Sequence, residues 1–262
     1  MLDELVDIML ASLVSPDPLS LLLMAMVIYF MAGVIKGTLG IGFPTAAVSL
    51  FAQVTDARTA ITVVIMPMLL TNVWQVIRGR KFLSVIRQMW LLLLMMLVFI
   101  LVFSQLASMV RVEILAAVLG GIVSIYALHS LYAKPLRLNP AYDRPAQIVA
   151  GVSAGIMGGM VSVWAPPILI YMQTLRLPKD QFVATVGVLL LLGTCVLLMS
   201  YVGSGVLGYG LFLCSALLVV PSLLGFTVGE QVRKRLSAQR FERLLLWFFF
   251  IMGLNLIRRA VF

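Results

Sequence analysis

This chain has little charge and few of the residues that build catalytic or metal centres. Only 11% of its 262 residues are Asp, Glu, Lys or Arg, and there is a single histidine; an average soluble domain is about 25% charged. The two cysteines, Cys195 and Cys214, lie in apolar stretches without metal-ligand spacing, so we interpret them as packing residues. The apolar segments hold neither paired carboxylates nor a His/Asp arrangement, which disfavours an enzyme. A GxxxxGK loop followed by Ser or Thr is also absent, which disfavours ATP hydrolysis by this chain.

What the chain has instead is apolar sequence. Hydrophobic residues make up 62% of it, and the mean hydropathy is +1.11. Runs such as "WLLLLMMLVFILVFSQLA" and "LLLWFFFIMGLNLI" approach the roughly 20 residues that a helix needs to cross a bilayer. The short alternating strands typical of a membrane barrel are absent. The sequence therefore predicts an all-α polytopic membrane protein.

Two of the apolar segments, 19–52 and 146–175, are too long for one span and too short for two. Each contains a break rich in glycine and proline, "GTLGIGFP" in the first and "GIMGGMVSVWAPP" in the second. We predict that each segment forms a broken helical hairpin, re-entrant in the membrane, whose short second leg begins at the proline. The other apolar segments are predicted transmembrane helices, at 59–77, 88–108, 112–133, 183–202, 206–229 and 241–257.

Basic residues gather in four connections between these segments. The stretches 78–87, 134–144, 176–179 and 233–243 hold four, three, two and five Lys or Arg, which makes fourteen of the nineteen. The positive-inside rule places these loops in the cytoplasm, and it explains the net charge of +9 better than nucleic-acid binding does. Both termini then face the periplasm. The first 18 residues contain four acids and no Lys or Arg, which predicts an outer amphipathic lead-in and not a signal peptide. Asp56 and Arg58 are predicted in a solvated outer loop.

The two halves of the chain resemble each other. Gly33, Val34, Gly37 and Gly40 match Gly151, Val152, Gly155 and Gly158 at a shift of 118, and Pro44, Thr62, Val63 and Thr71 match Pro167, Thr185, Val186 and Thr194 at a shift of 123. An odd number of spans separates the two hairpins, so the second copy is inverted. We predict two inverted repeats, 1–133 and 134–262, each a hairpin plus three transmembrane helices, as in many secondary transporters.

The breaks themselves suggest what is transported. A short leg that starts at a proline aims a helix N-terminus, with its partial positive charge, at the membrane centre. Lys36 adds a full charge beside the first break, and neither hairpin segment contains Asp or Glu. A bound anion is the simplest counter-charge, since an isolated lysine at mid-bilayer costs about 2.5–3.5 kcal/mol or more. The candidate anion-binding residues are Lys36, Gly37, Thr38, Gly40, Gly42, Phe43, Pro44, Thr45, Thr71, Asn72, Gly158, Ser162, Trp164, Ala165, Pro166, Pro167 and Thr194.

Other interpretations of these residues stay open. Glycines spaced as Gly33 and Gly37 are also typical of close helix packing. The Lys36 side chain could extend to an interface, or serve as a neutral lysine in proton coupling. The Thr71 and Thr194 hydroxyls could bond carbonyls of their own helices, and Trp164 could be a core residue.

Both breaks together, "GVIKGTLGIGFP" and "GIMGGMVSVWAPPILIYMQTLRLPKDQF", resemble the TauE/SafE family of sulfite exporters and anion permeases. The resemblance covers nearly the whole chain. It implies transport of sulfite, an organosulfonate or a related sulfur-containing anion across the bacterial inner membrane. Ala165 and the bulky Trp164 precede Pro166, where the family pattern would have glycine before two prolines.

Together these observations favour a secondary anion transporter that works by alternating access, with export as the expected direction. The driving force is the proton gradient or the membrane potential, and no cofactor or metal is expected. An anion channel and a permease for another small anion or carboxylate remain alternatives, and a homodimer remains open.

Overall fold

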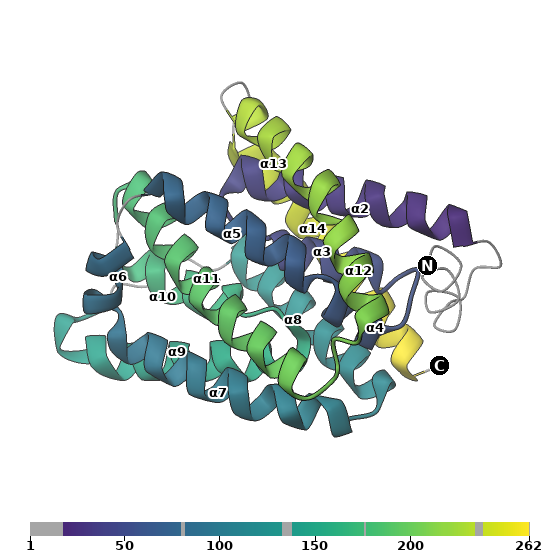
Figure 1. Ribbon diagram of the computed structural model, residues 1–262. Helices are drawn as coiled ribbons and strands as arrows, with labels where there is room; N and C mark the ends of the chain where they lie inside the picture. Colours follow the sequence, from purple (N-terminus) through teal and green to yellow (C-terminus); the bar gives the residue numbers. More distant parts are fainter. Residues whose placement is uncertain (1–17, 80–81, 133–137, 176, 234–237, 262) are drawn as a thin grey trace.

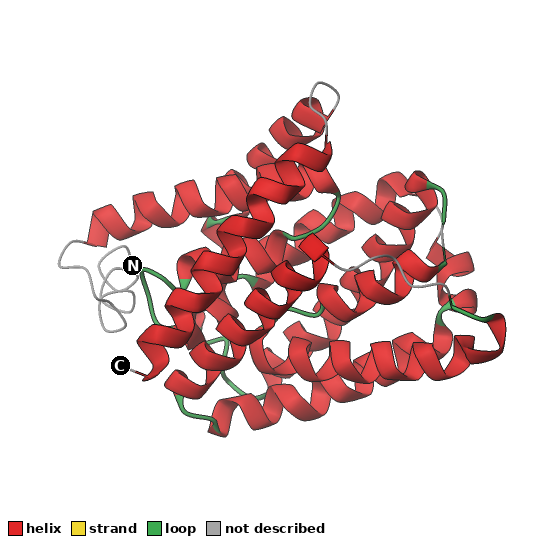
Figure 2. Cartoon of the chain, turned by 180° about the vertical axis from the view of Figure 1, so that it is seen from behind, coloured by secondary structure: helices red, strands yellow, loops and turns green. Residues whose placement is uncertain are grey.

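The computed structural model describes residues 18–79, 82–132, 138–175, 177–233 and 238–261, and within them it is helical without any strand (Figures 1 and 2). This confirms the all-α prediction; the predicted lead-in at residues 1–17 lies outside the described part. The elements in chain order are α2 (Pro18–Leu39), α3 (Phe43–Phe51), α4 (Ala57–Val63), α5 (Ile65–Gly79), α6 (Phe82–Gln88), α7 (Trp90–Met109), α8 (Val112–Tyr132), the 3-10 turn η1 (Pro140–Tyr142), α9 (Asp143–Val161), α10 (Ala165–Thr174), α11 (Lys179–Gly203), α12 (Tyr209–Leu217), α13 (Val219–Arg233) and α14 (Ala238–Val261).

Six stretches of helix are long and apolar enough to cross a membrane, which supports a multi-pass membrane protein. They are Leu19–Leu39, Ala57–Ile77, Trp90–Met109, Val112–Tyr132, Gln181–Gly203 and Tyr209–Arg233. Five of them correspond to predicted spans, and the sixth is α2, the first leg of the first predicted hairpin. At 22 residues α2 is about 33 Å long. The predicted span 241–257 lies within α14.

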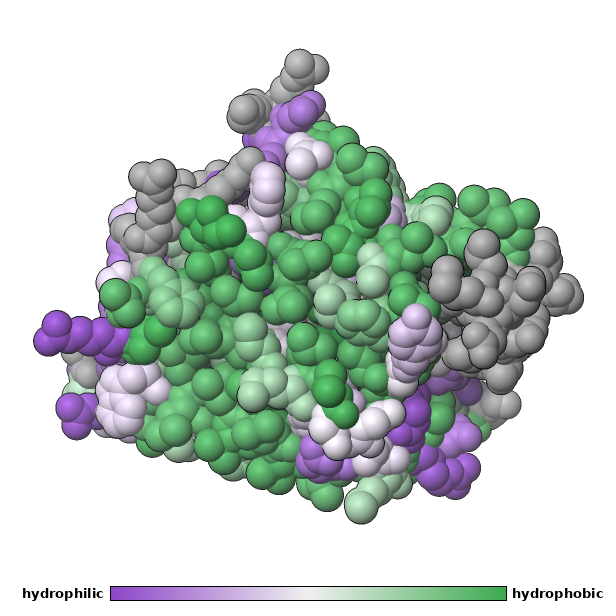
Figure 3. All heavy atoms as spheres, viewed as in Figure 1, coloured by the Kyte–Doolittle hydropathy of each residue, from purple (hydrophilic) through white to green (hydrophobic). Residues whose placement is uncertain are grey.

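The helices run between two ends of the molecule. We name the end where α2 begins and α14 finishes the terminal end (Figure 1). Helices α5, α8, α10 and α13 finish at the opposite end, and each is followed in the sequence by one of the four basic stretches. Apolar residues cover most of the middle of the face shown in Figure 3, and hydrophilic residues gather at its margins. This distribution is the one expected for a protein with a lipid belt.

Glycines bring two pairs of helices into backbone contact. Helix α2 packs along α13, and α7 packs along α9. A Cβ built on Gly33 would lie 2.2 Å from the Ser222 carbonyl oxygen, and one on Gly225 would lie 2.0 Å from the Phe30 carbonyl oxygen. On α9, a Cβ at Gly151 would lie 2.5 Å from a carbonyl oxygen of α7. Small residues allow such approach where lipid offers no hydrophobic driving force.

The predicted span 59–77 is kinked, and a serine from another helix bonds the backbone groups that the kink leaves free. Pro67 has no N–H and its ring displaces the carbonyl four residues earlier, so α4 ends at Val63. The Ser215 hydroxyl donates to the Val63 carbonyl oxygen at 2.7 Å and accepts from the Met66 N–H at 3.0 Å. The kinked backbone is thereby satisfied inside the protein, as hydrocarbon surroundings require.

The glycine contacts predict a contrast between two Gly→Ala variants. Gly225→Ala should destabilise the protein by about 1–3 kcal/mol, because the added methyl group meets the α2 backbone. Gly121→Ala, with nothing within 4 Å of its Cβ, should leave stability unchanged or raise it by up to about 1 kcal/mol. Thermal unfolding of the two variants in detergent measures the difference. Equal melting temperatures would contradict the close contact of α2 and α13.

Candidate functional site

The first hairpin breaks where two glycines follow α2. Gly40 and Gly42 have φ angles of 81° and 88°, in the left-handed region that favours glycine. The Gly40 N–H still donates to the Lys36 carbonyl oxygen at 2.6 Å. Gly42 then caps α3, which begins at Phe43 with Pro44 in its first turn. The predicted short second leg is therefore present, starting one residue before the predicted proline.

The second hairpin breaks at a serine instead of a glycine. Ser162 closes α9 with a φ of 57°, and α10 begins at Ala165 with Pro166 next. The Ser162 hydroxyl donates to the Ile61 carbonyl oxygen at 3.1 Å and lies 2.9 Å from the Tyr201 hydroxyl. Gly158, which the sequence comparison matched to Gly40, is helical. A Cβ there would lie 2.9 Å from the Trp164 ring, so Gly158 makes room for this tryptophan.

Lys36 is wholly buried and binds side chains of α5. Its Nζ donates to the Thr71 hydroxyl at 3.1 Å and to Asn72 Oδ1. The Asn72 amide in turn donates to the Thr194 hydroxyl of α11 at 3.0 Å. Four predicted residues from three helices thus form one hydrogen-bonded network. We call these four, Lys36, Thr71, Asn72 and Thr194, the lysine network.

Lys36 is the one charged side chain that is buried among the described residues. Its hydrogen-bond partners are neutral, and the Phe43 ring centroid lies 6.0 Å from Nζ. Both threonine hydroxyls donate to their own helices, Thr71 to the Pro67 carbonyl at 2.8 Å and Thr194 to the Leu190 carbonyl at 2.6 Å. The local bonding considered for these threonines is therefore present together with the contact between helices.

The two helix N-termini differ in how many amide donors they offer. In the first turn of α3, Phe43 and Thr45 have free N–H groups, whereas Ala46 donates to the Gly42 carbonyl oxygen at 2.9 Å. In α10 the second and third positions are Pro166 and Pro167, which have no N–H. The N-terminus of α10 is thus a weaker amide site than the sequence interpretation assumed, because only Ala165 offers an N–H within its first three positions.

Trp164 is fully buried between the second hairpin and α11. A Cβ on Gly193, the neighbour of Thr194, would lie 3.1 Å from its ring. Among the described residues its Nε1 has no hydrogen-bond partner. A buried indole N–H normally finds an acceptor, so Trp164 is a donor without an acceptor among the described residues, and it packs against Gly193, the chain neighbour of Thr194.

Other predicted residues have structural roles. Gly37 packs on α13, where a Cβ would lie 2.2 Å from the Phe226 carbonyl oxygen. Thr38 also faces α13 and donates to the Gly229 carbonyl at 3.3 Å. Thr45 is buried in α3, and its carbonyl accepts from Ser49 at 2.5 Å. These contacts confirm the packing interpretation for Gly37.

Sequence reasoning missed Gln75, which bonds the first break to the second half of the chain. Its side-chain amide donates to the Gly40 carbonyl at 3.1 Å and to the Val183 carbonyl at 2.9 Å. The residue lies one helical turn after Thr71, on the same face of α5. That spacing was the signal that could have identified it.

An apolar cavity of about 480 Å³ reaches the second hairpin. Pro166 and Pro167 line it together with Ile122 of α8, Val149 of α9 and Leu138 near the opposite end. It therefore extends along the second hairpin to the start of α10.

The described residues contain no group of three His, Cys, Asp or Glu that could hold a metal ion.

Comparison with known proteins gives one match. The family model described as "Sulfite exporter TauE/SafE" matches residues 25–256, which include both breaks and most of the chain. No curated protein and no solved structure matches the chain.

The left-handed glycines predict that the first break is sensitive to a single methyl group. Gly42→Ala should cost about 1–2 kcal/mol, because a Cβ at this φ is strained although the nearest atom would lie at 3.6 Å. Gly208→Ala is the matched control, since Gly208 has a φ of −65° and nothing within 4 Å. Chemical denaturation in detergent compares the two variants. Similar losses of unfolding free energy in the two variants would show that the first break does not depend on glycine at position 42.

Proposed function

The chain belongs to the TauE/SafE sulfite exporter family, and from this premise we propose that it is a secondary transporter of a small sulfur-containing anion. The substrate is sulfite or an organosulfonate, which crosses the bacterial inner membrane by alternating access in the export direction. Membership of the family supports a membrane transporter of the anion-export type. The observation that carries the choice of site is a buried Lys36 with neutral partners.

Electrostatics makes the lysine network an incomplete site. An ammonium taken out of water loses hydration that two neutral oxygens restore only in part. Neither hairpin segment contains a carboxylate. An oxyanion beside Nζ would supply the missing charge, and the second N–H of the Asn72 amide could donate to it. The free N–H groups of Phe43 and Thr45 begin the helix next to Lys36, and Trp164 would add an indole donor.

The helix contacts support two inverted repeats, 1–133 and 134–262, as the frame of this site. In such an arrangement α2 is equivalent to α9, and α13 is equivalent to α7. The contact of α2 with α13 then corresponds to that of α9 with α7. In both pairs the helices run parallel, and glycines allow their backbones to come into contact. Helices α8 and α14 pack together, and so do α5 and α11. In each of these pairs the symmetry would exchange one helix for the other. Broken hairpins at a repeat interface are typical of secondary transporters.

We infer the orientation from the basic connections. Fourteen of the nineteen Lys and Arg residues belong to the connections of the opposite end and the helix ends beside them. The positive-inside rule then assigns that end to the cytoplasm and the terminal end to the periplasm.

Alternating access would have to expose Lys36, whose exposed fraction is 0%. Full burial supports a carrier over an open channel, because a pore would leave the charge in contact with water. The cavity at Pro166 and Pro167 lies on the cytoplasmic side of the second break in this orientation. The proton gradient or the membrane potential would drive transport. Substitution of Lys36 tests the site.

Lys36→Met should lower sulfite flux at least about 30-fold, since loss of a buried charged partner costs about 2 kcal/mol or more. The protein should still fold, because methionine fills a similar volume without a charge to bury. Flux of radiolabelled sulfite and methanesulfonate into liposomes, with and without a pH gradient, measures the effect. Arg111→Gln is the control, since it removes an exposed cation that pairs with Glu113. Unchanged flux in Lys36→Met would exclude Lys36 from the site.

A further inference from the structure

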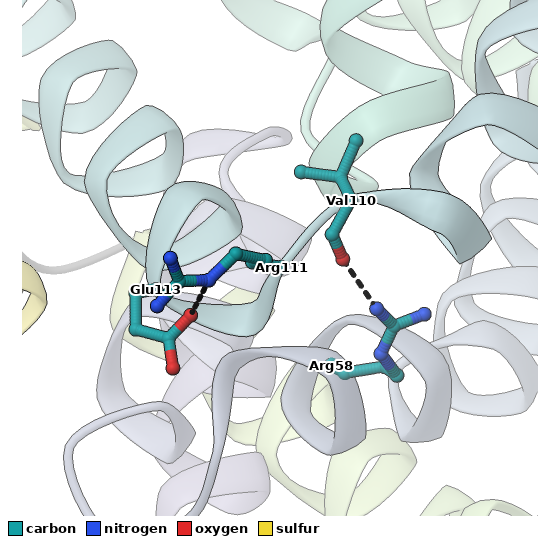
Figure 4. A network of polar contacts seen from close by, with 4 residues as sticks. All are labelled: Arg58, Val110, Arg111 and Glu113. Atoms are coloured by element: carbon teal, nitrogen blue, oxygen red, sulfur yellow. Dashed lines mark hydrogen bonds and ion pairs between the residues drawn. The ribbon is translucent and has the colours of Figure 1, made fainter.

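Arg58 is a second cation without an acidic partner. It was predicted in a solvated loop, but it belongs to α4 and is half-buried. Its guanidinium donates to the Ser108 carbonyl at 3.1 Å. It also donates to the Val110 carbonyl at 2.6 Å (Figure 4). Among the described residues no carboxylate lies within ion-pair distance of it, whereas neighbouring Arg111 pairs with Glu113 at 3.2 Å. Two of its five N–H donors are thus used.

Hydroxyl-bearing and apolar side chains together line a small cleft beside Arg58. The cavity measures about 20 Å³ and is lined by Arg58 with the hydroxyl side chains of Thr62, Ser104 and Tyr201. These three residues come from α4, α7 and α11, and at most 3% of each is exposed. In this structure the Thr62 hydroxyl donates to the Arg58 carbonyl at 2.9 Å, the Ser104 hydroxyl donates to the Leu101 carbonyl at 3.0 Å, and the Tyr201 hydroxyl bonds that of Ser162. The unused guanidinium N–H groups are therefore the donors available to an oxyanion, and the hydroxyls would have to turn towards it. A space of this size holds about one water molecule and no oxyanion, so the cleft is shut in this structure.

The cleft leads to the second break. The Tyr201 hydroxyl lies 2.9 Å from that of Ser162, which stands at the break itself. On the other side of the break, Pro166 and Pro167 line the cavity of about 480 Å³. The second break therefore lies between the apolar cavity of about 480 Å³ towards the opposite end and the small cleft beside Arg58 at the terminal end.

We propose that Arg58, with the hydroxyls of Thr62, Ser104 and Tyr201, forms a second anion-binding site for sulfite or sulfonate groups. It lies at the terminal end of the anion path, and a shift of α4 against α11 opens it. The proposal rests on the proposed function in that the same anion passes both sites. The planar guanidinium can bind two oxygens of a sulfonate side by side, which the ammonium of Lys36 cannot.

A structural role for Arg58 makes a different prediction. The carbonyls that it binds stand at the end of α7 and just beyond it, so Arg58 could simply fasten α4 to α7. A fastening residue would affect folding and both directions of transport alike. An anion site would affect binding at one membrane face, and it would bind anions even in a protein that does not transport.

The direct test is anion protection of a cysteine beside the cleft. Ser108 is exposed and lines the cleft, so Ser108→Cys, in a chain with Cys195→Ala and Cys214→Ala, accepts an impermeant maleimide. Methanesulfonate should slow this labelling at least fivefold relative to chloride at equal ionic strength. Arg58→Gln should abolish the protection and Arg58→Lys should weaken it, since an ammonium cannot bind two oxygens side by side, whereas Arg111→Gln should keep it. Absence of protection in the chain with Arg58 intact, or equal protection in Arg58→Gln, would overturn the proposal.

Transport by the same variants separates this site from the lysine network. In liposomes, Arg58→Gln should raise the KM for methanesulfonate about tenfold at the periplasmic face and leave the cytoplasmic KM unchanged, with Arg111→Gln equal to the parent chain. An equal change at both faces would favour the fastening role and contradict the proposal. If labelling is protected although no anion is transported, the Arg58 site stands and the proposed function fails. If anions are transported but do not protect the cysteine, the proposed function stands and the Arg58 site fails.

Discussion

A backbone N–H or carbonyl group inside the bilayer must find its partner in the protein, and the two breaks in this fold depend on that constraint. Each break is bonded from another helix. Gln75 of α5 satisfies the Gly40 carbonyl, and Ser162 at the second break binds the Ile61 carbonyl and contacts Tyr201 of α11. The same constraint explains Ser215, which repairs the kink before Pro67. Interrupted helices are therefore stable here only because α4, α5, α11 and α12 surround them with polar groups at the right depth.

The lysine network follows from the same arrangement. A charged side chain next to the first break would be very unfavourable in lipid, yet Thr71 and Asn72 provide oxygens for it, and Thr194 holds the Asn72 amide in place. This network joins the first hairpin to one helix from each half of the chain. The partners of Nζ are neutral and carry no charge that would cancel that of an ammonium, which is the basis of the proposed anion site. A carboxylate in place of Asn72 would cancel that attraction.

The sequence predicted part of this site for sound physical reasons. Lys36, Asn72 and the two repeat-related threonines stand out because polar residues are rare in spans, and each joins the network. Gly37 was predicted both as a site residue and as a possible packing residue, and the structure shows its packing on α13. Glycine spacing alone does not distinguish a break from a helix contact, whereas the positive φ angles of Gly40 and Gly42 do. Gln75 was missed because it stands near the end of an apolar segment, where polar residues are ordinary, and Arg58 was predicted in a solvated outer loop for the same reason.

The sequence by itself determined that this is a helical membrane protein with two interrupted hairpins, because segment length, proline and glycine act over a few residues of the chain. Only the tertiary structure decided which polar groups meet. The contact of Lys36 with Asn72 joins residues 36 positions apart, and that of Asn72 with Thr194 joins residues 122 positions apart. Such contacts depend on how α2, α5 and α11 are rotated and how far each is shifted along its axis. For α2, the packing of Gly33 and Gly37 on α13 sets that rotation, but their spacing does not say which helix they contact.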